Sequence, residues 1–262
     1  MRLLQGIFTK INEMLMNHQI GAYGVVIESN TTTCPTGIKF VVNDRGELIE
    51  GDPEIDLLSF HKELQKSIDE RLSITLKLLE GIKVFIDPIY PSINLLIFGG
   101  GHIAVPLVKL GKLMNYRVTV MDDRTEFANS VRFTEADKVI CKSFEMSCEN
   151  LALDANSFVI IITRGHRYDL SCLEAVLRSP VQPAYIGMIG SRRKVAAIKE
   201  ALIEKGIPEE LLNKVYAPIG LDIGAQTPEE IALSILSEIV MVSHYGISNG
   251  LKTQANGRKN NG

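Results

Sequence analysis

The sequence predicts an α/β protein, in which a small α+β N-terminal domain precedes a Rossmann-like domain whose parallel sheet is covered by helices on both faces. From Asn94 onward, short apolar runs alternate with segments of helical periodicity, the pattern typical of a parallel sheet buried on both faces. The first of these runs leads into three consecutive glycines at the start of a helix, as in dinucleotide-binding βαβ units.

The elements of the C-terminal domain follow from this alternation, because each apolar run is expected to be a strand and each amphipathic segment a helix. The expected strands are 95–98, 117–121, 138–141, 158–163 and 184–187. The expected helices are 102–114, 169–178, 192–204 and 228–244. Open parallel sheets bind their ligands at the carboxyl ends of the strands, so the loops after these strands hold the candidate binding residues.

The N-terminal domain is expected to combine helices with short strands, because the hydrophobic period changes along its length. Helices are expected at 3–17 and around 55–64, strands at 22–28 and 38–42, a turn at 43–46 and a hairpin over 73–86. Pro88 and Pro91 oppose both helix and central strand, so the domain boundary is placed there. The expected domains span residues 1–90 and 91–247, followed by a flexible polar tail over 248–262.

Charge and composition exclude several classes of function. The net charge of −3 provides no positive field for a polyanion, so binding to nucleic acid or to a membrane surface is not expected. No apolar run approaches transmembrane length and the N-terminus lacks a secretory pattern, which indicates a cytoplasmic protein. The four cysteines form no C-x-x-C pair, so neither a zinc site nor a disulfide framework is expected. A homodimer is the default expectation for the oligomeric state.

The first candidate binding site is the glycine turn after the first strand of the C-terminal domain. Gly99 allows a tight turn, Gly101 lets the backbone approach a pyrophosphate, and Ala104 allows the next helix to pack closely. The helix N-terminus adds free amide groups and the positive end of its dipole, and His102 lies within this turn. The next strand ends in Asp122 and Asp123, about 20 residues further on, where a carboxylate accepts ribose hydroxyls, and Asp122 is the preferred candidate.

Polar residues also follow the fourth predicted strand of this domain, on the side where a ligand is expected. Arg164 is suited to hold a phosphate, and His166 to hydrogen-bond or protonate a bound group near neutral pH. Asp169 is expected to be the N-cap of the helix that follows.

A second glycine-bearing turn follows the fifth predicted strand. Its candidate ligand contacts are Gly187, Gly190, Ser191, Arg192, Arg193 and Lys194. Ser191 is expected to cap the next helix, and cations in the first helical turn oppose the dipole, which suggests a bound anion.

A third polar loop precedes the last predicted helix. Thr227, Pro228 and Glu230 form the pattern of a capping box and are therefore architectural. Gly220, Asp222 and Gly224 have no structural need that is evident from the sequence, and Gly220 and Asp222 join the candidate contacts.

Five segments of the chain resemble a known family. In order, they read GGGHIA, VTVMDDRTEFAN, TRGHRYD, YIGMIGSRRK and PIGLDIGAQTPEEIALSILSEIV. Together they resemble the C-terminal domain of the XdhC/CoxI family of xanthine dehydrogenase accessory factors, over residues 94–244. The resemblance implies a maturation chaperone that binds molybdenum cofactor and assists its sulfuration or insertion into a molybdenum hydroxylase such as xanthine dehydrogenase. It also implies a sulfur-donating enzyme as a further partner.

The N-terminal match to this family is poorer. The stretches TTTCPTGIKFVV and GELIEGDPEID keep Gly37, Lys39 and Gly51 but lose the arginine and most glycines of the family pattern, which argues against a part in cofactor binding. Cys34 lies in the first stretch and is a weak candidate for offering sulfur to a molybdenum species, because a lone cysteine usually packs as a small apolar residue.

Two other functions use the same features. A nicotinamide-dependent oxidoreductase would bind NAD(P) at the glycine turn, with His166 as its candidate catalytic acid or base. A nucleotide-sensing scaffold would need no chemistry. The small N-terminal domain offers no recognisable acid–base pair or metal set, which favours the maturation factor. The sequence leaves open whether the ligand is a molybdopterin dinucleotide, a mononucleotide form or NAD(P).

Overall fold

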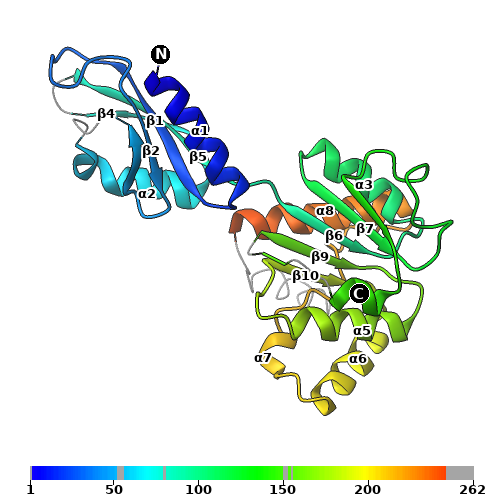
Figure 1. Ribbon diagram of the computed structural model, residues 1–262. Helices are drawn as coiled ribbons and strands as arrows, with labels where there is room; N and C mark the ends of the chain where they lie inside the picture. Colours follow the sequence, from blue (N-terminus) through cyan, green and yellow to red (C-terminus); the bar gives the residue numbers. More distant parts are fainter. Residues whose placement is uncertain (1, 52–55, 79–80, 150–152, 155, 246–262) are drawn as a thin grey trace, which may run out of the picture. The chain divides into compact units, whose positions relative to one another are not determined.

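The computed structural model describes the chain except for residues 1, 52–55, 79–80, 150–152, 155 and 246–262 (Figure 1). The chain divides into two compact units, Met1–Ser92 and Ile93–Gly262, and each is described by itself. The tail expected at 248–262 lies outside the described residues.

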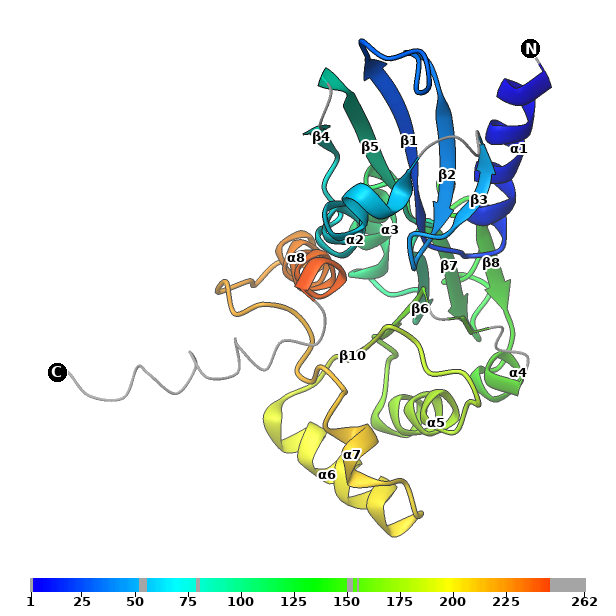
Figure 2. The same cartoon turned by 90° about the vertical axis from the view of Figure 1, so that its left-hand side faces the viewer.

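The first unit is built on an antiparallel sheet with the order β3-β2-β1-β5-β4. Its strands are β1 (Gly21–Glu28), β2 (Lys39–Asn43), β3 (Leu48–Gly51), β4 (Ile74–Lys77) and β5 (Lys83–Ile89). Helix α1 (Arg2–Met16) packs Ile7 and Met14 against one face of this sheet. Helix α2 (His61–Glu70), preceded by the 3₁₀ turn Leu57–Phe60, packs Leu64 and Ile68 against the other face (Figure 2). Each face of the sheet is therefore covered by one helix.

Most of the elements expected in this unit are present, with three differences. Strand β3 was not expected, because its four residues are short and show no alternation of buried and exposed side chains. The second helix continues to Glu70, beyond the predicted end at 64. Pro88 was expected to end a strand but lies inside β5, where it pairs with Ala22 of β1. The pairing of β5 with β4 ends before it, at Ile86. A proline is tolerated there because the strand has a neighbour on one side only.

The second unit is a parallel sheet with the order β10-β9-β6-β7-β8. Its strands are β6 (Asn94–Phe98), β7 (Arg117–Asp122), β8 (Lys138–Cys141), β9 (Ser157–Ile161) and β10 (Tyr185–Met188). Counted along the chain from β6, this is the 3-2-1-4-5 order of dinucleotide-binding sheets. The predicted Rossmann-like fold is confirmed.

Helices cover both faces of this sheet, as predicted (Figure 1). Helices α3 (Ala104–Leu113) and α8 (Pro228–Tyr245) contribute to one hydrophobic core. The opposite core receives α4 (Phe144–Glu149), α5 (His166–Leu177), α6 (Arg192–Glu204) and α7 (Glu209–Leu212). The short helices α4 and α7 were not expected, because one or two turns carry too little hydrophobic periodicity to be recognised.

In the second unit, the starts of α3 and α5 differ from the sequence expectation, and those of α6 and α8 agree with it. Helix α5 begins at His166 with Gly165 as its N-cap, so the prediction that Asp169 caps it is wrong; Asp169 lies in the first turn and is fully buried. Helix α3 begins at Ala104, after the turn that contains His102. Helix α6 begins at Arg192, as expected, and the Ser191 hydroxyl accepts a hydrogen bond from the amide of Lys194 at 3.3 Å.

The capping box of α8 yields a stability test. The Thr227 hydroxyl accepts from the Glu230 amide at 3.2 Å, while the Glu230 carboxylate accepts from the Thr227 amide at 3.1 Å. Replacing Thr227 by Ala leaves the Glu230 amide without this acceptor, and we expect the free energy of unfolding to fall by about 1 kcal/mol in urea denaturation. Thr227→Ser keeps the hydroxyl and should match the wild type. Equal stability of the Ala and wild-type proteins would contradict this account.

Candidate functional site

The candidate site lies at the carboxyl ends of β6, β9 and β7, where the order of the strands reverses. Strand β6 is central, and it pairs with β7 on one side and β9 on the other. A Cβ placed on Gly99, directly after β6, would lie 3.1 Å from the Cα of Thr163, which follows β9. The loops after these strands therefore meet at the point where open α/β sheets bind their ligands.

The three glycines after β6 have different surroundings. Gly99 has a φ of 114°, and a Cβ there would lie 2.4 Å from the carbonyl oxygen of Ile162. A Cβ on Gly100 would lie 2.0 Å from the carbonyl oxygen of Phe127. Neither position can hold a side chain without moving the backbone. A Cβ on Gly101 would have no atom within 4 Å, so this glycine borders open space.

Ala104, the first residue of α3, is fully buried against the sheet, as its expected packing role requires. The side chain of His102, two residues earlier, is exposed. The open space beside Gly101 therefore lies at the N-terminus of α3, where backbone amides and the helix dipole favour an anion.

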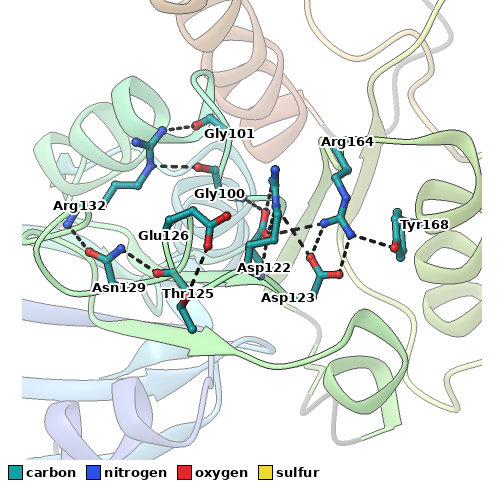
Figure 3. A network of polar contacts seen from close by, with 11 residues as sticks. Gly100, Gly101, Asp122, Asp123, Thr125, Glu126, Asn129, Arg132, Arg164 and Tyr168 are labelled. Carbon is teal, nitrogen blue, oxygen red and sulfur yellow. Dashed lines mark hydrogen bonds and ion pairs between the residues drawn. The ribbon is translucent and has the colours of Figure 1, made fainter.

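Asp122 is buried and engaged by protein donors. Its Oδ1 accepts from the backbone amide of Arg124 at 3.1 Å and from Nε of Arg124 at 2.9 Å. Its Oδ2 accepts from the amide of Gly100 at 2.8 Å and from Nη2 of Arg124 at 3.0 Å (Figure 3). The side chain is 1% exposed and its oxygens hold about as many donors as a carboxylate can accept. In this arrangement Asp122 orients the glycine turn, and the hydrogen bonds to Asp122 raise the pKa of Arg124.

Two arginines that the sequence analysis did not select support the same turn. Arg132 donates to the carbonyl oxygen of Gly100 from Nε at 3.1 Å and to that of Gly101 from Nη2 at 3.4 Å (Figure 3). The guanidinium of Arg124 stacks on the ring of Phe127, 3.6 Å from its centroid. Arg124 follows the predicted aspartate directly and could have been suspected, whereas Arg132 lies in an irregular segment without a motif.

Arg164 forms a charged contact from the end of β9 to the end of β7. Its Nη2 donates to Oδ2 of Asp123 at 2.8 Å and to the hydroxyl of Tyr168 at 2.8 Å, and its Nη1 pairs with Oδ1 of Asp123 (Figure 3). The guanidinium also lies over the Tyr168 ring, 4.4 Å from its centroid. Hydrogen bonding from Arg164 holds the pKa of the Asp123 carboxyl below its usual range.

Lys194 is separated from the other two cations of its helix. Its ammonium group pairs with the carboxylate of Asp169, which is 0% exposed and also accepts from the Thr163 hydroxyl at 2.5 Å. The lysine stem passes over Gly190, where a Cβ would lie 3.1 Å from its Cδ. Lys194 thus ties α6 to α5 and to the end of β9.

The remaining candidates divide into exposed residues and residues with a packing role. The exposed ones are His166, Arg192, Arg193 and Asp222. A Cβ on Gly187 would lie 2.4 Å from Cδ1 of Ile219, and one on Gly220, whose φ is 94°, would lie 2.4 Å from the Ser234 hydroxyl. Close packing therefore explains both glycines, and for Gly220 this structural need was not evident from the sequence.

Gly220 also belongs to a buried network around Glu238 of α8. The Glu238 carboxylate accepts from the Tyr185 hydroxyl and from the amide of Gly220, the latter at 3.2 Å. Burial, together with the charge of Glu238, raises the pKa of Tyr185 well above its usual value. This network joins α8 to β10 and orients the loop before α8.

Cys34, the weak metal candidate of the first unit, packs against the hydrophobic core between α2 and the sheet. Among the residues that the structure describes, no group of three or more His, Cys, Asp and Glu side chains could hold a metal ion. Within the same described residues, no helix has both the length and the apolar character that crossing a membrane requires.

Comparison with known proteins identifies the family. Residues 95–239 match the family described as the XdhC Rossmann domain, which is more than half of the chain. The chain belongs to the XdhC family. This confirms the resemblance that five sequence motifs indicated.

Two relatives of this XdhC family member are longer proteins. It is 33% identical over 152 residues to the uncharacterized protein YqeB of Escherichia coli K12, an alignment that covers 58% of this chain and 27% of YqeB. It is 31% identical over 157 residues to a protein of Bacillus subtilis 168 named as a probable subunit of xanthine dehydrogenase, covering 60% of this chain and 45% of that protein. The alignments thus span less than half of either relative.

A solved structure shares the fold. A crystal structure of a xanthine dehydrogenase from Bacillus halodurans superimposes with a TM-score of 0.70 at 19% identity. The match covers 97% of this chain and 69% of the other. At this level of identity the likeness concerns the fold alone.

The four hydrogen bonds that the Asp122 carboxylate accepts yield the second test, which concerns stability. In Asp122→Asn, one oxygen becomes an NH₂ group that cannot accept from Gly100 or Arg124, so we expect the free energy of unfolding to fall by about 2 kcal/mol. Hydrogen exchange at the Gly100 amide should become faster. Asp123→Asn is the matched control, because the Asp123 side chain is 20% exposed and its partner Arg164 is also reached by solvent. A similar loss of stability in both variants would refute the distinct role of Asp122.

Proposed function

We propose that this XdhC family member is an accessory factor that binds molybdenum cofactor at the ends of β6, β7 and β9 and assists its sulfuration or insertion into a xanthine dehydrogenase-type hydroxylase. The observation that carries the proposal is the open space at Gly101, bordered by the glycine turn and the N-terminus of α3. Family membership and the Bacillus subtilis relative, named as part of a probable xanthine dehydrogenase, support the choice of ligand and partner.

The donors around this space fit a phosphate-bearing ligand. Gly101 allows the backbone to come close to a phosphate, and the first amides of α3 are suited to donate to its oxygens. Arg164 lies at the end of the adjacent strand β9 and offers a planar guanidinium, which binds phosphate through two parallel hydrogen bonds. The exposed Arg192 and Arg193 add positive charge at the end of β10.

The protein's part in this proposal is binding and orientation. Molybdenum cofactor is the cargo, and its own centre carries the chemistry in the hydroxylase that receives it. Asp122 and Arg132 would keep the glycine turn in its shape whether or not the cargo is present, because their contacts run to the backbone of Gly100 and Gly101. A preformed turn lowers the entropy cost of binding.

The first experiment is a calorimetric titration of the purified protein with molybdenum cofactor under anaerobic conditions, and separately with NAD⁺, NADH, NADP⁺ and NADPH. We expect tight, saturable binding of molybdenum cofactor and at most weak binding of the nicotinamides, at millimolar concentration. Tight binding of a nicotinamide alone would replace the proposal by an oxidoreductase, for which the exposed His166 would be the first residue to test.

Gly101→Val tests the position of the ligand. Apart from Gly101 and its two chain neighbours, no residue has an atom within 4 Å of the added Cβ, so we expect the free energy of unfolding to change by about 0.5 kcal/mol or less. A side chain there would block the approach of a phosphate to the backbone, and affinity for molybdenum cofactor should fall at least about tenfold. Gly99→Val is the contrast, because its side chain would meet the backbone of Ile162 and should damage the fold itself. Full affinity in a folded Gly101→Val protein would remove the turn from the site.

A further inference from the structure

The contact between Arg164 and Asp123 crosses the site. Strands β9 and β7 lie on opposite sides of β6, so their ends are about 10 Å apart. The Arg164 side chain must pass over the carboxyl end of β6 to reach Asp123. That end leads into Gly99, and the ion pair lies beside Asp122, whose carboxylate accepts from the Gly100 amide (Figure 3). A pyrophosphate on the glycine turn would therefore lie next to the ion pair.

This ion pair is better placed to exchange its partner than the two pairs that hold the buried carboxylates of Asp122 and Asp169. The Arg164 and Asp123 side chains are 34% and 20% exposed. The pairs Arg124–Asp122 and Lys194–Asp169 instead have carboxylates that are 1% and 0% exposed and that accept additional hydrogen bonds from a backbone amide or from Thr163. Removing either of those two cations would take the nearest positive charge away from a buried carboxylate, which is costly.

The surroundings of the pair would hold both partners while they separate. The Tyr168 hydroxyl accepts from Nη2 of Arg164 and the Tyr168 ring lies under its guanidinium, so the arginine keeps its place without Asp123. On the other side, Nε of Arg124 lies 3.9 Å from Oδ1 of Asp123 and keeps a positive charge beside that carboxylate.

We propose that the Asp123 carboxylate binds Arg164 where a phosphate of the ligand would otherwise bind it. This proposal rests on the function proposed above. A ligand that carries a pyrophosphate next to a ribose takes over the guanidinium, and the Asp123 carboxylate becomes free to accept the ribose hydroxyls. Carboxylate and phosphate both match the donor geometry of a guanidinium, so Arg164 keeps equivalent hydrogen bonds when one replaces the other. The exchange assigns to Asp123 the ribose contact that the sequence suggested for Asp122, whose oxygens are already occupied by Gly100 and Arg124.

The proposal makes opposite predictions for two simple probes. Inorganic pyrophosphate competes with Asp123 for Arg164 and gains nothing from a free carboxylate, so Asp123→Asn should strengthen its binding, by about threefold or more. ADP gains from the carboxylate through its ribose, and 2′,3′-dideoxy-ADP does not. The wild type should therefore prefer ADP over the dideoxy compound by about tenfold, and Asp123→Asn should lose that preference.

The experiment is calorimetric titration of the full chain at low ionic strength with pyrophosphate, ADP and 2′,3′-dideoxy-ADP. Arg164→Gln should weaken all three ligands by about tenfold, because each uses the guanidinium. Asp137→Asn is the matched control: Asp137 pairs with Lys112 at 2.7 Å and accepts from the amide of Val118, near the opposite end of β7, so its loss should change no affinity. Urea denaturation of each variant confirms that the folded protein is being titrated.

Several results would overturn the exchange. They are unchanged or weaker pyrophosphate binding in Asp123→Asn, a preference for ADP that survives in that variant, unchanged affinities in Arg164→Gln, and no binding of any probe to the wild type at millimolar concentration. Failure here with successful binding of molybdenum cofactor would leave the proposed function intact. Success here without binding of molybdenum cofactor would instead retain the exchange and assign the site to another nucleotide, which the nicotinamide titrations identify.

Discussion

The buried carboxylate of Asp122 connects the end of β7 to the glycine turn after β6, and the shape of the whole site depends on that connection. Gly99 and Gly100 bring the turn so close to the neighbouring loops that no side chain fits at either position. Such close packing leaves the Gly100 amide without water, and Asp122 supplies its acceptor. Because Arg124 neutralises the same carboxylate, the charge is stable in a buried place.

Burial separates the charged groups of the site into two kinds. Asp122 and Asp169 are almost without solvent exposure; Asp122 ties β7 to the glycine turn, and Asp169 ties α5 to α6. Asp123, Arg164, Arg192 and Arg193 are reached by solvent. The combination of buried, fixed charges with solvent-accessible ones supports the proposed function, in which the protein holds a ligand and later releases it.

Much of the fold could be predicted because its determinants are local. Each parallel strand is a short apolar run, and the capping box of α8 lies within residues 226–230. The glycine turn was recognised for the same reason, since its spacing and the following helix are adjacent in sequence. The short elements β3, α4 and α7 escaped notice because they carry too few residues to show a period.

The sequence by itself determined the class of fold, the family and the position of the glycine turn, because hydrophobic period, capping and motif spacing are properties of neighbouring residues. Only the tertiary structure decided which charges meet. Lys194 follows two exposed arginines, yet it finds its partner Asp169 25 residues away in the chain, and Arg164 reaches Asp123 across 41 residues. Partners at such separations are set by the order of the strands and the packing of the helices, so the sequence could nominate Asp122 and Lys194 as ligand contacts but could not show that protein groups already occupy them.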